Sequence, residues 1–400
     1  MKLFVHIFII FVFCGIIMIE MSDNMIKESK FRVEKNILIP IILFAIISII
    51  TIYCTRDLIS SDLQNLYLKQ LLWYFIGFGV AYLLMTVGNK FLYNNAYIFY
   101  IVGVILLVLV LFFGKEINNA RCWFVIPFLG SFQPSEFMKI FLIIILSRMI
   151  KDFNNDKRLG DILDEFKFLL KVLIVVGIPS VLTFIEPDTG AVLIYLVITI
   201  VMLFVGGFRA RWFIITILTL LIIGTIFLGI YFLNQDLFIQ IFGTSFFYRM
   251  DRILNWSNSS GMQLTNGVTA IGSAGFFGHG FNNTPIYFPE MQTDFIFAVF
   301  ASNFGFLGAL ILISIIVYFD VSIIGLANKS YDTSDKLTIA GILSILLFQQ
   351  IWNICMTIGL LPIMGITLPF ISYGGSSLLS YMILIGMLFN ISNESLRFKN

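Results

Sequence analysis

The sequence predicts an all-α protein that crosses a membrane many times, and two observations carry this prediction. Apolar residues make up 59% of the 400-residue chain and charged residues only 12%, with a mean hydropathy of +0.97. A soluble domain keeps roughly a quarter of its residues charged, so this chain must meet lipid over much of its surface. Its long unbroken apolar runs predict helices, because a lipid-embedded backbone satisfies its hydrogen bonds only in a helix or a closed barrel.

Ten apolar runs are long enough to be membrane spans. They cover about residues 37–54, 68–88, 94–113, 134–149, 168–186, 189–206, 212–233, 291–319, 337–358 and 370–391. The longest soluble stretch, about residues 234–290, predicts a large loop before helix 8. The expected fold is therefore a ten-helix bundle, formed as one domain by residues 25–400.

The distribution of Lys and Arg predicts the orientation of the bundle, because cytoplasmic loops are enriched in these residues. With Lys35 placed in the cytoplasm, seventeen of the 25 Lys and Arg residues fall in inner segments and seven in outer segments. Both ends of the ten-span bundle are then cytoplasmic, and the loop at 234–290 is extracellular.

Residues 1–24 form an extra N-terminal segment whose apolar run, residues 3–19, has three interpretations. It is longer than a usual signal-peptide core, and no small-residue cleavage site follows it. It is either an additional helix with the N-terminus outside, a signal-like segment, or the product of a misassigned start, with translation beginning at Met21 or Met25.

Charge and composition exclude several classes of function. The net charge is +2, far too balanced for a surface that binds nucleic acid. Two His and four Cys residues without a C-x-x-C pair argue against a zinc site or a disulfide framework. The stretch Gly272–Gly280 is glycine-rich but lacks the P-loop pattern, so no nucleotide or other organic cofactor is expected.

Five polar clusters fall at the predicted extracellular ends of the spans. They are Arg121–Trp123, Gln133–Lys139, Glu186–Gly190, Pro289–Asp294 and Ser372–Ser377. Ionisable residues at the membrane boundary are costly and therefore informative. Their convergence on one side predicts a functional site there.

Asp294 is the sharpest candidate, because a carboxylate stands directly before an apolar run. Thr293 or Asp294 could be only the N-cap of a helix. Partial desolvation would instead raise the pKa of the Asp294 carboxyl toward the range that suits a general base. The sequence favours catalysis over capping.

The other clusters have structural alternatives of similar weight. Pro134 and Glu136 suit the first turn of a helix, whereas Lys139, one turn inside the span, needs an anion nearby. Glu186–Gly190 is typical of a tight turn between two helices. Ser372–Ser377 could equally be a flexible segment that leads into the last helix. Tyr248–Trp256 has the pattern of a helix lying along the membrane interface.

The motifs at these clusters resemble the SEDS family (shape, elongation, division and sporulation), which polymerises lipid II into peptidoglycan. The resemblance covers about residues 37–392. Its carriers are Ala120–Trp123, Phe132–Lys139, Glu186–Gly190, Phe288–Ala298, Gly359–Pro362 and Leu368–Ser377. The resemblance implies a ten-helix SEDS-type bundle in the bacterial cell membrane with an active site that faces outside, and Asp294 matches the family's essential acidic residue.

The implied reaction is attack of the GlcNAc 4-hydroxyl of one lipid II on the anomeric MurNAc carbon of another, with loss of undecaprenyl pyrophosphate. By resemblance, Asp294 is the base or a metal ligand, and a divalent cation, Mg²⁺ or Mn²⁺, is expected without an independent metal motif. The substrate-binding residues expected from the motifs are Arg121, Lys139, Lys69, Trp123, Glu136, Asp188, Ser376 and Ser377. The implied partners are a class B penicillin-binding protein transpeptidase and other proteins of the elongation or division complex.

Some positions depart from the family pattern, and two rival functions stay open. Asn119 replaces a Gly before the Ala-Arg pair, and Ser257 stands where a Pro often ends the interfacial helix. Ser302-Asn303 replaces an acidic stretch, so no second acid is expected there.

Asn353–Leu360 and Leu378–Met382 are more similar to the elongation branch, RodA, than to the division branch, FtsW. The rivals are a lipid II flippase, which needs ionisable groups at mid-bilayer and on both faces, and a noncatalytic scaffold.

Overall fold

The fold is that of a computed structural model, which describes residues 33–117, 120–126, 130–156, 161–244, 246, 247, 250, 254 and 261–397. The predicted segment at residues 1–24 lies outside the described residues, as does most of the predicted interfacial helix Tyr248–Trp256. Asn119 and Ser257 lie outside them too.

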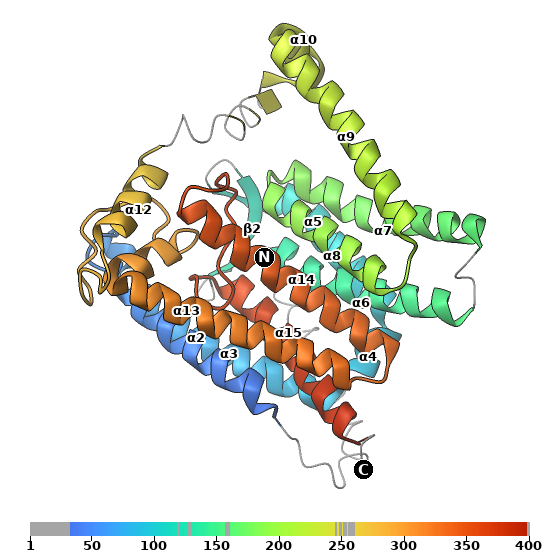
Figure 1. The fold of residues 1–400 in the computed structure, drawn as a ribbon, viewed down its shortest axis with the longest axis horizontal. Helices are drawn as coiled ribbons and strands as arrows, with labels where there is room; N and C mark the ends of the chain where they lie inside the picture. The colour runs from blue at the N-terminus through green and yellow to red at the C-terminus, as the bar shows by residue number, and fades with distance from the viewer. Residues whose placement is uncertain are drawn as a thin grey trace.

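Helices dominate the described chain (Figure 1). In chain order the elements are α2 (Lys35–Tyr53), the 3-10 helix η1 (Ser61–Leu63), α3 (Leu66–Val87), α4 (Asn89–Asn94), α5 (Ala96–Phe113), β1 (Lys115–Ile117), β2 (Ala120–Ile126), β3 (Gly130–Phe132), α6 (Pro134–Asn155), α7 (Ile162–Ile185), α8 (Thr189–Val205), α9 (Ala210–Leu233), α10 (Gln235–Phe242), α12 (Met262–Ser273), α13 (Ile296–Lys329), α14 (Thr333–Thr357) and α15 (Gly375–Arg397). Each of the ten predicted spans coincides with a helix.

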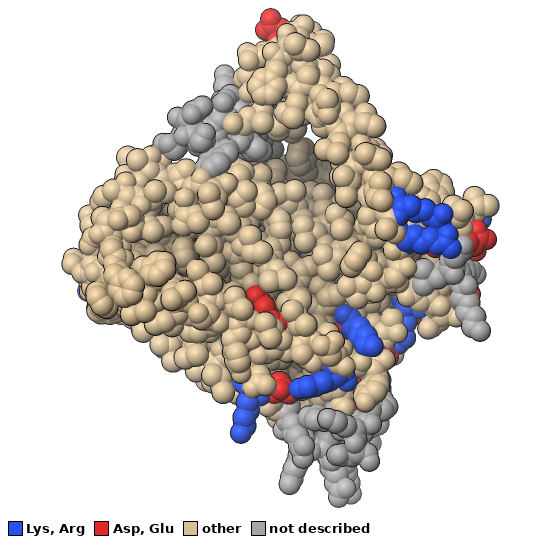
Figure 2. Space-filling model, in the orientation of Figure 1, with Lys and Arg blue, Asp and Glu red and all other residues tan. Residues whose placement is uncertain are grey.

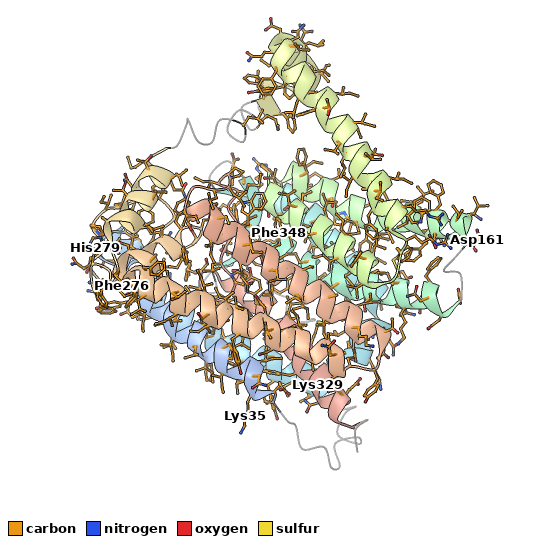
Figure 3. All side chains as sticks on the ribbon, viewed as in Figure 1. Lys35, Asp161, Phe276, His279, Lys329 and Phe348 are labelled. Carbon is orange, nitrogen blue, oxygen red and sulfur yellow. The ribbon has the colours of Figure 1, made fainter. Side chains whose placement is uncertain are left out.

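The lengths and composition of these helices confirm a polytopic membrane protein. Eight helices in the described part of the chain are long and apolar enough to cross a membrane. The helix α8 is shorter, with 17 residues, and α6, with 22 residues, carries charged side chains along its length. Lys35 and Lys329 lie at one end of the bundle, and Phe276 and His279 lie at the other (Figure 3).

The two ends of the bundle differ in charge. Lys329 pairs with Glu34 at 3.8 Å, which brings the end of α13 to the start of α2. Asp294 precedes α13 and therefore lies at the opposite end, so we refer to the Lys35 end and the Asp294 end. Most of the surface in Figure 2 carries no charged side chain, and the visible Lys and Arg side chains gather toward one side of it.

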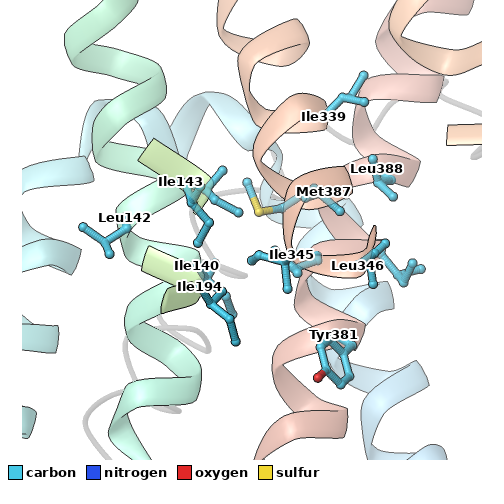
Figure 4. Close-up of a cluster of buried hydrophobic side chains, with 14 of the residues drawn as sticks. Ile140, Leu142, Ile143, Ile194, Ile339, Ile345, Leu346, Tyr381, Met387 and Leu388 are labelled. Atoms are coloured by element: carbon cyan, nitrogen blue, oxygen red, sulfur yellow. The ribbon is translucent and has the colours of Figure 1, made fainter. Parts of the chain in front are cut away.

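The helix α6 forms the centre of the bundle. Every residue from 138 to 147 is buried, and all of them except Lys139 and Ser147 are apolar. A helix segment with apolar residues on every face is expected to be enclosed by others. It packs against α5, α7, α8, α14 and α15. Ile140 and Ile143 of α6 meet Ile194 of α8, Ile345 of α14 and Met387 of α15 in the buried cluster of Figure 4.

A small antiparallel sheet at the Asp294 end was not predicted from the sequence. Its strand order is β1-β2-β3, with Lys115 opposite Trp123 and Phe124 opposite Phe132. The sheet connects α5 to α6, so it positions Arg121 and Trp123 beside the start of α6.

The helix α13 differs from the predicted span 291–319 at both ends. It starts at Ile296 and continues to Lys329. The predicted span ended before Asp320, but this carboxylate is accommodated because Gln350 of α14 donates a hydrogen bond to it, at 3.3 Å. A search for uncharged apolar runs therefore underestimates the length of α13, because the buried carboxylate of Asp320 has a hydrogen-bond partner in α14.

A kink in α13 receives the glycine-rich stretch. Gly305 is non-helical, with φ 67°, and the carbonyls of Ser302 and Asn303 accept hydrogen bonds from the main-chain amides of His279 and Gly280, both at 3.0 Å. A Cβ at Gly278 would lie 2.2 Å from the main-chain oxygen of Asn303. These main-chain amides therefore hold the glycine-rich stretch against α13 and are not free to bind an anion.

The predicted loop at 234–290 is partly helical in the residues described. It contains α10, which follows the end of α9, and α12, which packs against α13. In Figure 1, α9 and α10 project away from the other helices. Tyr231 is the one buried residue of α9, so this helix offers nearly its whole apolar surface to lipid.

Candidate active site

Asp294 lies in the turn that leads into α13, and α14 holds its main chain. The side-chain amide of Asn353 donates 2.7 Å hydrogen bonds to the main-chain oxygens of Asp294 and Ile366. Asn353 is fully buried, so both segments are fixed against α14. The N-cap of α13 is Phe295, and no side chain caps this helix end. The capping alternative for Asp294 is therefore wrong.

The segment between α14 and α15 wraps around the Asp294 turn. The hydroxyl of Ser372 donates to the main-chain oxygen of Thr293 at 2.6 Å, and the amide of Tyr373 donates to that of Gln292 at 2.8 Å. Gly365 in this segment has φ +66°, and a Cβ there would lie 3.6 Å from Asp294 Oδ2. The carboxylate thus lies directly beside the main chain of a left-handed glycine.

Asp188 is anchored by hydrogen bonds at the start of α8. Its Oδ1 accepts from the amide of Ala191 at 3.0 Å, which caps the helix. Its Oδ2 accepts from Gln133 Nε2 at 2.8 Å and from Ser135 Oγ at 3.0 Å. The predicted tight turn is confirmed, since α7 ends at Ile185, and it also ties α8 to α6.

The Asp188 turn and the Asp294 turn contact the same segment. A Cβ at Gly190 would lie 3.0 Å from the main-chain oxygen of Met364, and Met364 precedes the Gly365 that lies beside Asp294. The two carboxyl groups, 106 positions apart in the sequence, are thus brought to neighbouring residues of the α14–α15 connection.

The surroundings of Asp294 hold its carboxyl near the point of half-ionisation at neutral pH. Burial, followed by the negative charges of the nearby Glu290 and Asp188 carboxylates, raises the pKa of Asp294 to about 7. Burial also raises the pKa of Asp188. The raised pKa agrees with the expectation from the sequence, and a carboxyl with a pKa near the operating pH is suited to act as a general base.

Glu186 is a buried carboxyl that the sequence did not distinguish from turn polarity. It is fully buried, and neither carboxyl oxygen has a hydrogen-bond partner among the described residues. Burial, followed by the charge of Asp188, raises its pKa to about 9. The thiol of Cys122 donates to its main-chain oxygen at 2.7 Å. Its surroundings therefore favour the neutral form of the Glu186 carboxyl.

Lys139 has its anion within the protein. Its Nζ lies 2.7 Å from Glu136 Oε2, and its side chain is 1% exposed. The same Glu136 oxygen accepts from Ser380 at 3.2 Å, and the ammonium lies over the ring of Tyr381, 5.5 Å from the centroid. Lys139 and Glu136 therefore form an ion pair within the protein, and their expected contacts with substrate stay a prediction.

Arg121 and Trp123 are carried by β2. The side chain of Arg121 is 57% exposed and its Nε lies 3.4 Å from Glu116 Oε2. Trp123 is partly buried. An exposed pair of this kind is weak, so a phosphate could replace Glu116 as the partner of Arg121 at small cost.

Lys69 is exposed on α3, and the residue after it joins α3 to the site. Gln70 is fully buried. Its amide donates to Ser48 Oγ at 3.1 Å and to the main-chain oxygen of Ser372 at 3.2 Å. Gln70 therefore holds the α14–α15 connection in place while Lys69 faces outward.

Ser376 and Ser377 have hydrogen-bond partners within the protein. Ser376 Oγ accepts from the amide of Gln133 at 3.1 Å and donates to the main-chain oxygen of Ser131 at 2.9 Å. Ser377 Oγ donates to the main-chain oxygen of Gly374 at 3.2 Å. Ser376 thus connects β3 to the start of α15, and the expected role of both serines in substrate binding stays a prediction.

The expected divalent cation has no preformed protein ligand set within the described ranges. No three His, Cys, Asp or Glu side chains there come together as metal ligands. Mg²⁺ and Mn²⁺ prefer several oxygen ligands, and Asp294 alone does not supply them. We therefore assign no chemical step to a metal.

A sequence model of the FtsW/RodA/SpoVE family, described as "Cell cycle protein", matches residues 34–397. The chain belongs to this family. The match confirms the resemblance inferred from the motifs, and the shared region contains every candidate site residue described above. Residues 1–24 lie outside it.

Relatives within the FtsW/RodA/SpoVE family include proteins from several bacteria. The probable peptidoglycan glycosyltransferase FtsW of Buchnera aphidicola subsp. Baizongia pistaciae is 32% identical over 346 residues, 83% of this chain and 85% of the relative. The peptidoglycan glycosyltransferase MrdB of Helicobacter pylori strain 26695 is 33% identical over 341 residues, 84% of this chain and 85% of the relative.

The fold is also that of a solved structure. A chain of a peptidoglycan synthase complex, studied for the coordination of polymerization and crosslinking, superposes with a TM-score of 0.75 at 24% sequence identity. The match covers 90% of this chain and 98% of that chain. It confirms the polytopic all-α bundle predicted from the apolar runs.

Proposed function

We propose that this chain is a peptidoglycan glycosyltransferase that polymerises lipid II, with Asp294 as its general base. The observation that carries the proposal is the placement of Asp294. It is not a helix cap, its main chain is fixed by Asn353, and its pKa is raised to about 7 by burial and by Glu290 and Asp188. The names of the FtsW and MrdB relatives support the same activity.

In the proposed reaction, the 4-hydroxyl oxygen of an acceptor GlcNAc attacks the anomeric carbon of a donor MurNAc. The new carbon–oxygen bond forms as the bond to the pyrophosphate oxygen breaks, and Asp294 takes the hydroxyl proton. Undecaprenyl pyrophosphate leaves with the electron pair. A pKa of about 7 suits the Asp294 carboxyl both to accept a proton and to release it afterwards.

Arg121 is the residue that we propose for the leaving pyrophosphate. It is exposed at the Asp294 end, and its guanidinium suits bidentate contact with phosphate oxygens. Lys69, also exposed, is a second cation for the same group. Mg²⁺ or Mn²⁺ stays an expectation from the family resemblance.

We further propose that the Asp294 end faces the outside of a bacterial cell membrane. The excess of Lys and Arg in the loops of the Lys35 end supports this orientation. A cysteine near Gly261 should react with an impermeant thiol reagent added to intact cells, and a cysteine near Asn155 should not. Labelling only of the cysteine near Asn155 would indicate the opposite orientation and contradict an external active site.

Elongation is the cellular role that we propose, with a class B penicillin-binding protein as partner. The sequences Asn353–Leu360 and Leu378–Met382 support the elongation branch, while the relatives carry both FtsW and MrdB names. Depletion of the protein should give round cells that still divide. Filaments without septa would instead assign it to division.

Polymerisation of labelled lipid II by the purified protein, with and without a class B penicillin-binding protein, tests the activity. Asp294→Asn keeps the size of the side chain but removes its basicity, and we expect a loss of about 10²-fold or more. Asp62→Asn, a change of an exposed aspartate in η1, is the matched control and should leave activity unchanged. Normal polymerisation by Asp294→Asn would overturn the assignment of the base.

A lipid II flippase is the second candidate, because buried acids also occur toward the Lys35 end. Asp320 and Asp335 are nearly fully buried in α13 and α14. The sequence analysis had instead placed the informative ionisable residues at the extracellular ends of the spans. Each has a hydrogen-bond partner, Gln350 and Tyr93 respectively, which is the pattern of a structural acid. Translocation of labelled lipid II in proteoliposomes without any polymer would favour the flippase.

A further inference from the structure

One face of α3 is buried against the rest of the bundle, and Gln70 lies on it. The buried residues of α3 recur every three or four positions, at 66, 70, 74, 77, 81 and 85, which is the spacing of a single helix face. The side chain of Gln70 is fully buried. A buried amide is costly unless its polar atoms are hydrogen-bonded, so the partners of Gln70 indicate what this face of α3 holds in place.

The side-chain amide of Gln70 binds the α14–α15 connection from two sides. Its Nε2 donates to the main-chain oxygen of Ser372 at 3.2 Å, and its Oε1 accepts from the amide of Gly374 at 3.4 Å. Its Nε2 also donates to Ser48 Oγ at 3.1 Å, on the neighbouring helix α2 (Figure 1). Ser48 Oγ then donates to the main-chain oxygen of Ile371 at 2.7 Å. Gln70 thus holds main-chain groups of residues 371–374, two directly and one through Ser48.

The main chain directly before these residues is strained at Phe370. Its φ is 66°, a conformation that a residue with a bulky side chain rarely adopts. The hydroxyl of Tyr74, one turn after Gln70 on α3, donates to the main-chain oxygen of Phe370. The Phe370 ring stacks on Phe44 of α2, with 5.8 Å between centroids, and meets Phe319 of α13 edge-on at 5.7 Å. Strained residues persist only where the surrounding structure holds them, so the conformation of the connection depends on its contacts with these helices.

The connection in turn holds the residues that precede Asp294. Ser372 Oγ accepts from the amide of Leu368 at 2.8 Å and donates to the main-chain oxygen of Thr293 at 2.6 Å. The amide of Tyr373 donates to the main-chain oxygen of Gln292 at 2.8 Å. The main-chain segment that Gln70 holds is therefore the segment that binds the start of the Asp294 turn.

We propose that Gln70 is a positioning residue for Asp294, which it reaches through the main chain of residues 371–374 and the hydroxyl of Ser372. The inference rests on the proposed function, in which Asp294 is the base. Asn353 holds the main chain of Asp294 from α14, and Gln70 holds the preceding residues from α3. Loss of the Gln70 amide should therefore displace the carboxylate without removing it.

Replacement of Gln70 in the full chain tests the proposal. Gln70→Met keeps the length of the side chain but removes its hydrogen bonds. We expect kcat for polymerisation of labelled lipid II to fall by about 10-fold to 10²-fold, the scale of an ångström-size displacement of a catalytic group, with KM nearly unchanged. A rise in KM with normal kcat, or normal values of both, would overturn the proposal.

Asn390→Leu is the matched control, because Asn390 is another buried amide that joins α15 to α3. Its Nδ2 donates to the main-chain oxygen of Leu84 at 2.8 Å, and its side chain is nearly fully buried. It lies toward the Lys35 end, where Ser392 donates to Glu34 at 3.3 Å. We expect both variants to lower the thermal midpoint to a similar extent but only Gln70→Met to lower kcat. Equal losses of kcat would assign Gln70 a merely structural role.

A double-mutant cycle tests the path through Ser372. Residues in one hydrogen-bond network are not additive, so Gln70→Met combined with Ser372→Ala should lower kcat by no more than the larger of the two single losses. Losses that multiply would show that the two residues act independently and would overturn the path.

Ser48→Ala is the second variant if Gln70→Met fails to accumulate. It removes one partner of Gln70 and frees the main-chain oxygen of Ile371. We expect it to lower kcat by about threefold or more, the scale of one hydrogen bond. An unchanged kcat would contradict the role of this network in positioning Asp294.

Hydrogen–deuterium exchange separates failure of this inference from failure of the proposed function, because it needs no activity. Exchange reports local opening of the structure, so it should become faster at residues 289–296 and 366–375 in Gln70→Met and stay as in wild type in Asn390→Leu. Wild type that does not polymerise lipid II, or Asp294→Asn that does, would show that the proposed function or its base is wrong. Unchanged exchange at residues 289–296 in Gln70→Met would instead overturn the link between Gln70 and the Asp294 turn.

Discussion

The side-chain amide of Asn353 on α14 donates a 2.7 Å hydrogen bond to the main-chain oxygen of Asp294. The same amide binds the main-chain oxygen of Ile366. One buried side chain therefore sets the distance between the proposed base and the segment that lines it.

Replacing Asn353 should misplace Asp294 without removing it. We expect Asn353→Ala to lower kcat by about 10-fold to 10²-fold, the scale of an ångström-size displacement of a catalytic group, with a small effect on KM. The pH at half-maximal kcat should stay unchanged if the role is positioning. A rise in KM with normal kcat, measured by lipid II polymerisation, would contradict this role.

The pH dependence of polymerisation should report the carboxyl of Asp294. Its pKa is raised to about 7, so the base form disappears and the rate falls as the pH drops below 7. Glu290→Gln removes a negative charge that contributes to the raised pKa, and the half-maximal rate should shift to lower pH. Asp62→Asn is the control for an exposed carboxylate, and an unshifted profile in Glu290→Gln would contradict the coupling.

Glu186 should make the protein less stable as the pH rises. Its pKa is raised from 4.5 to about 9 in the folded protein, so the unfolded chain releases a proton between these values that the folded chain retains. Linkage then lowers the stability of wild type progressively from about pH 4.5 to about pH 9. The thermal midpoint of Glu186→Gln, relative to wild type, should increase across this window, and a constant difference would show that Glu186 is ionised in the fold.

The positions of the helices were predictable because each span is a long apolar run, and all ten predicted starts lie within six residues of the start of the observed helix. Asp294 was identifiable as an acid at the edge of such a run. The partner residues were not, because the hydrogen bond from Asn353 crosses 59 positions and that from Gln70 to Ser372 crosses 302. A pattern read along one chain carries no signal for such pairs.

The same limitation applies to the internal partners of other candidate residues. Lys139 was expected to need an anion, and Glu136 one turn earlier supplies it at 2.7 Å. The sequence shows this i,i+3 spacing but not the burial of the Lys139 side chain. The hydrogen bonds from Ser376 to Ser131 and from Ser377 to Gly374 were likewise not predictable from the pattern.

Arg121 and Lys139 should respond differently to substitution, although both are cations of the motif region. Arg121 is exposed, so Arg121→Ala should raise KM for lipid II severalfold and leave the thermal midpoint nearly unchanged. Lys139→Ala leaves Glu136 as a buried charge without its cation, which should cost about 3–5 kcal/mol of stability.

A paired change separates the two effects at Lys139. Lys139→Met with Glu136→Gln removes both charges and keeps the volume, so stability should recover most of the loss seen in Lys139→Ala. If the ammonium contacts pyrophosphate, KM will stay high in the stable double variant. If Lys139 serves only Glu136, polymerisation will return with stability. The structure predicts the second outcome, because the buried ammonium already has the carboxylate and the ring of Tyr381 around it.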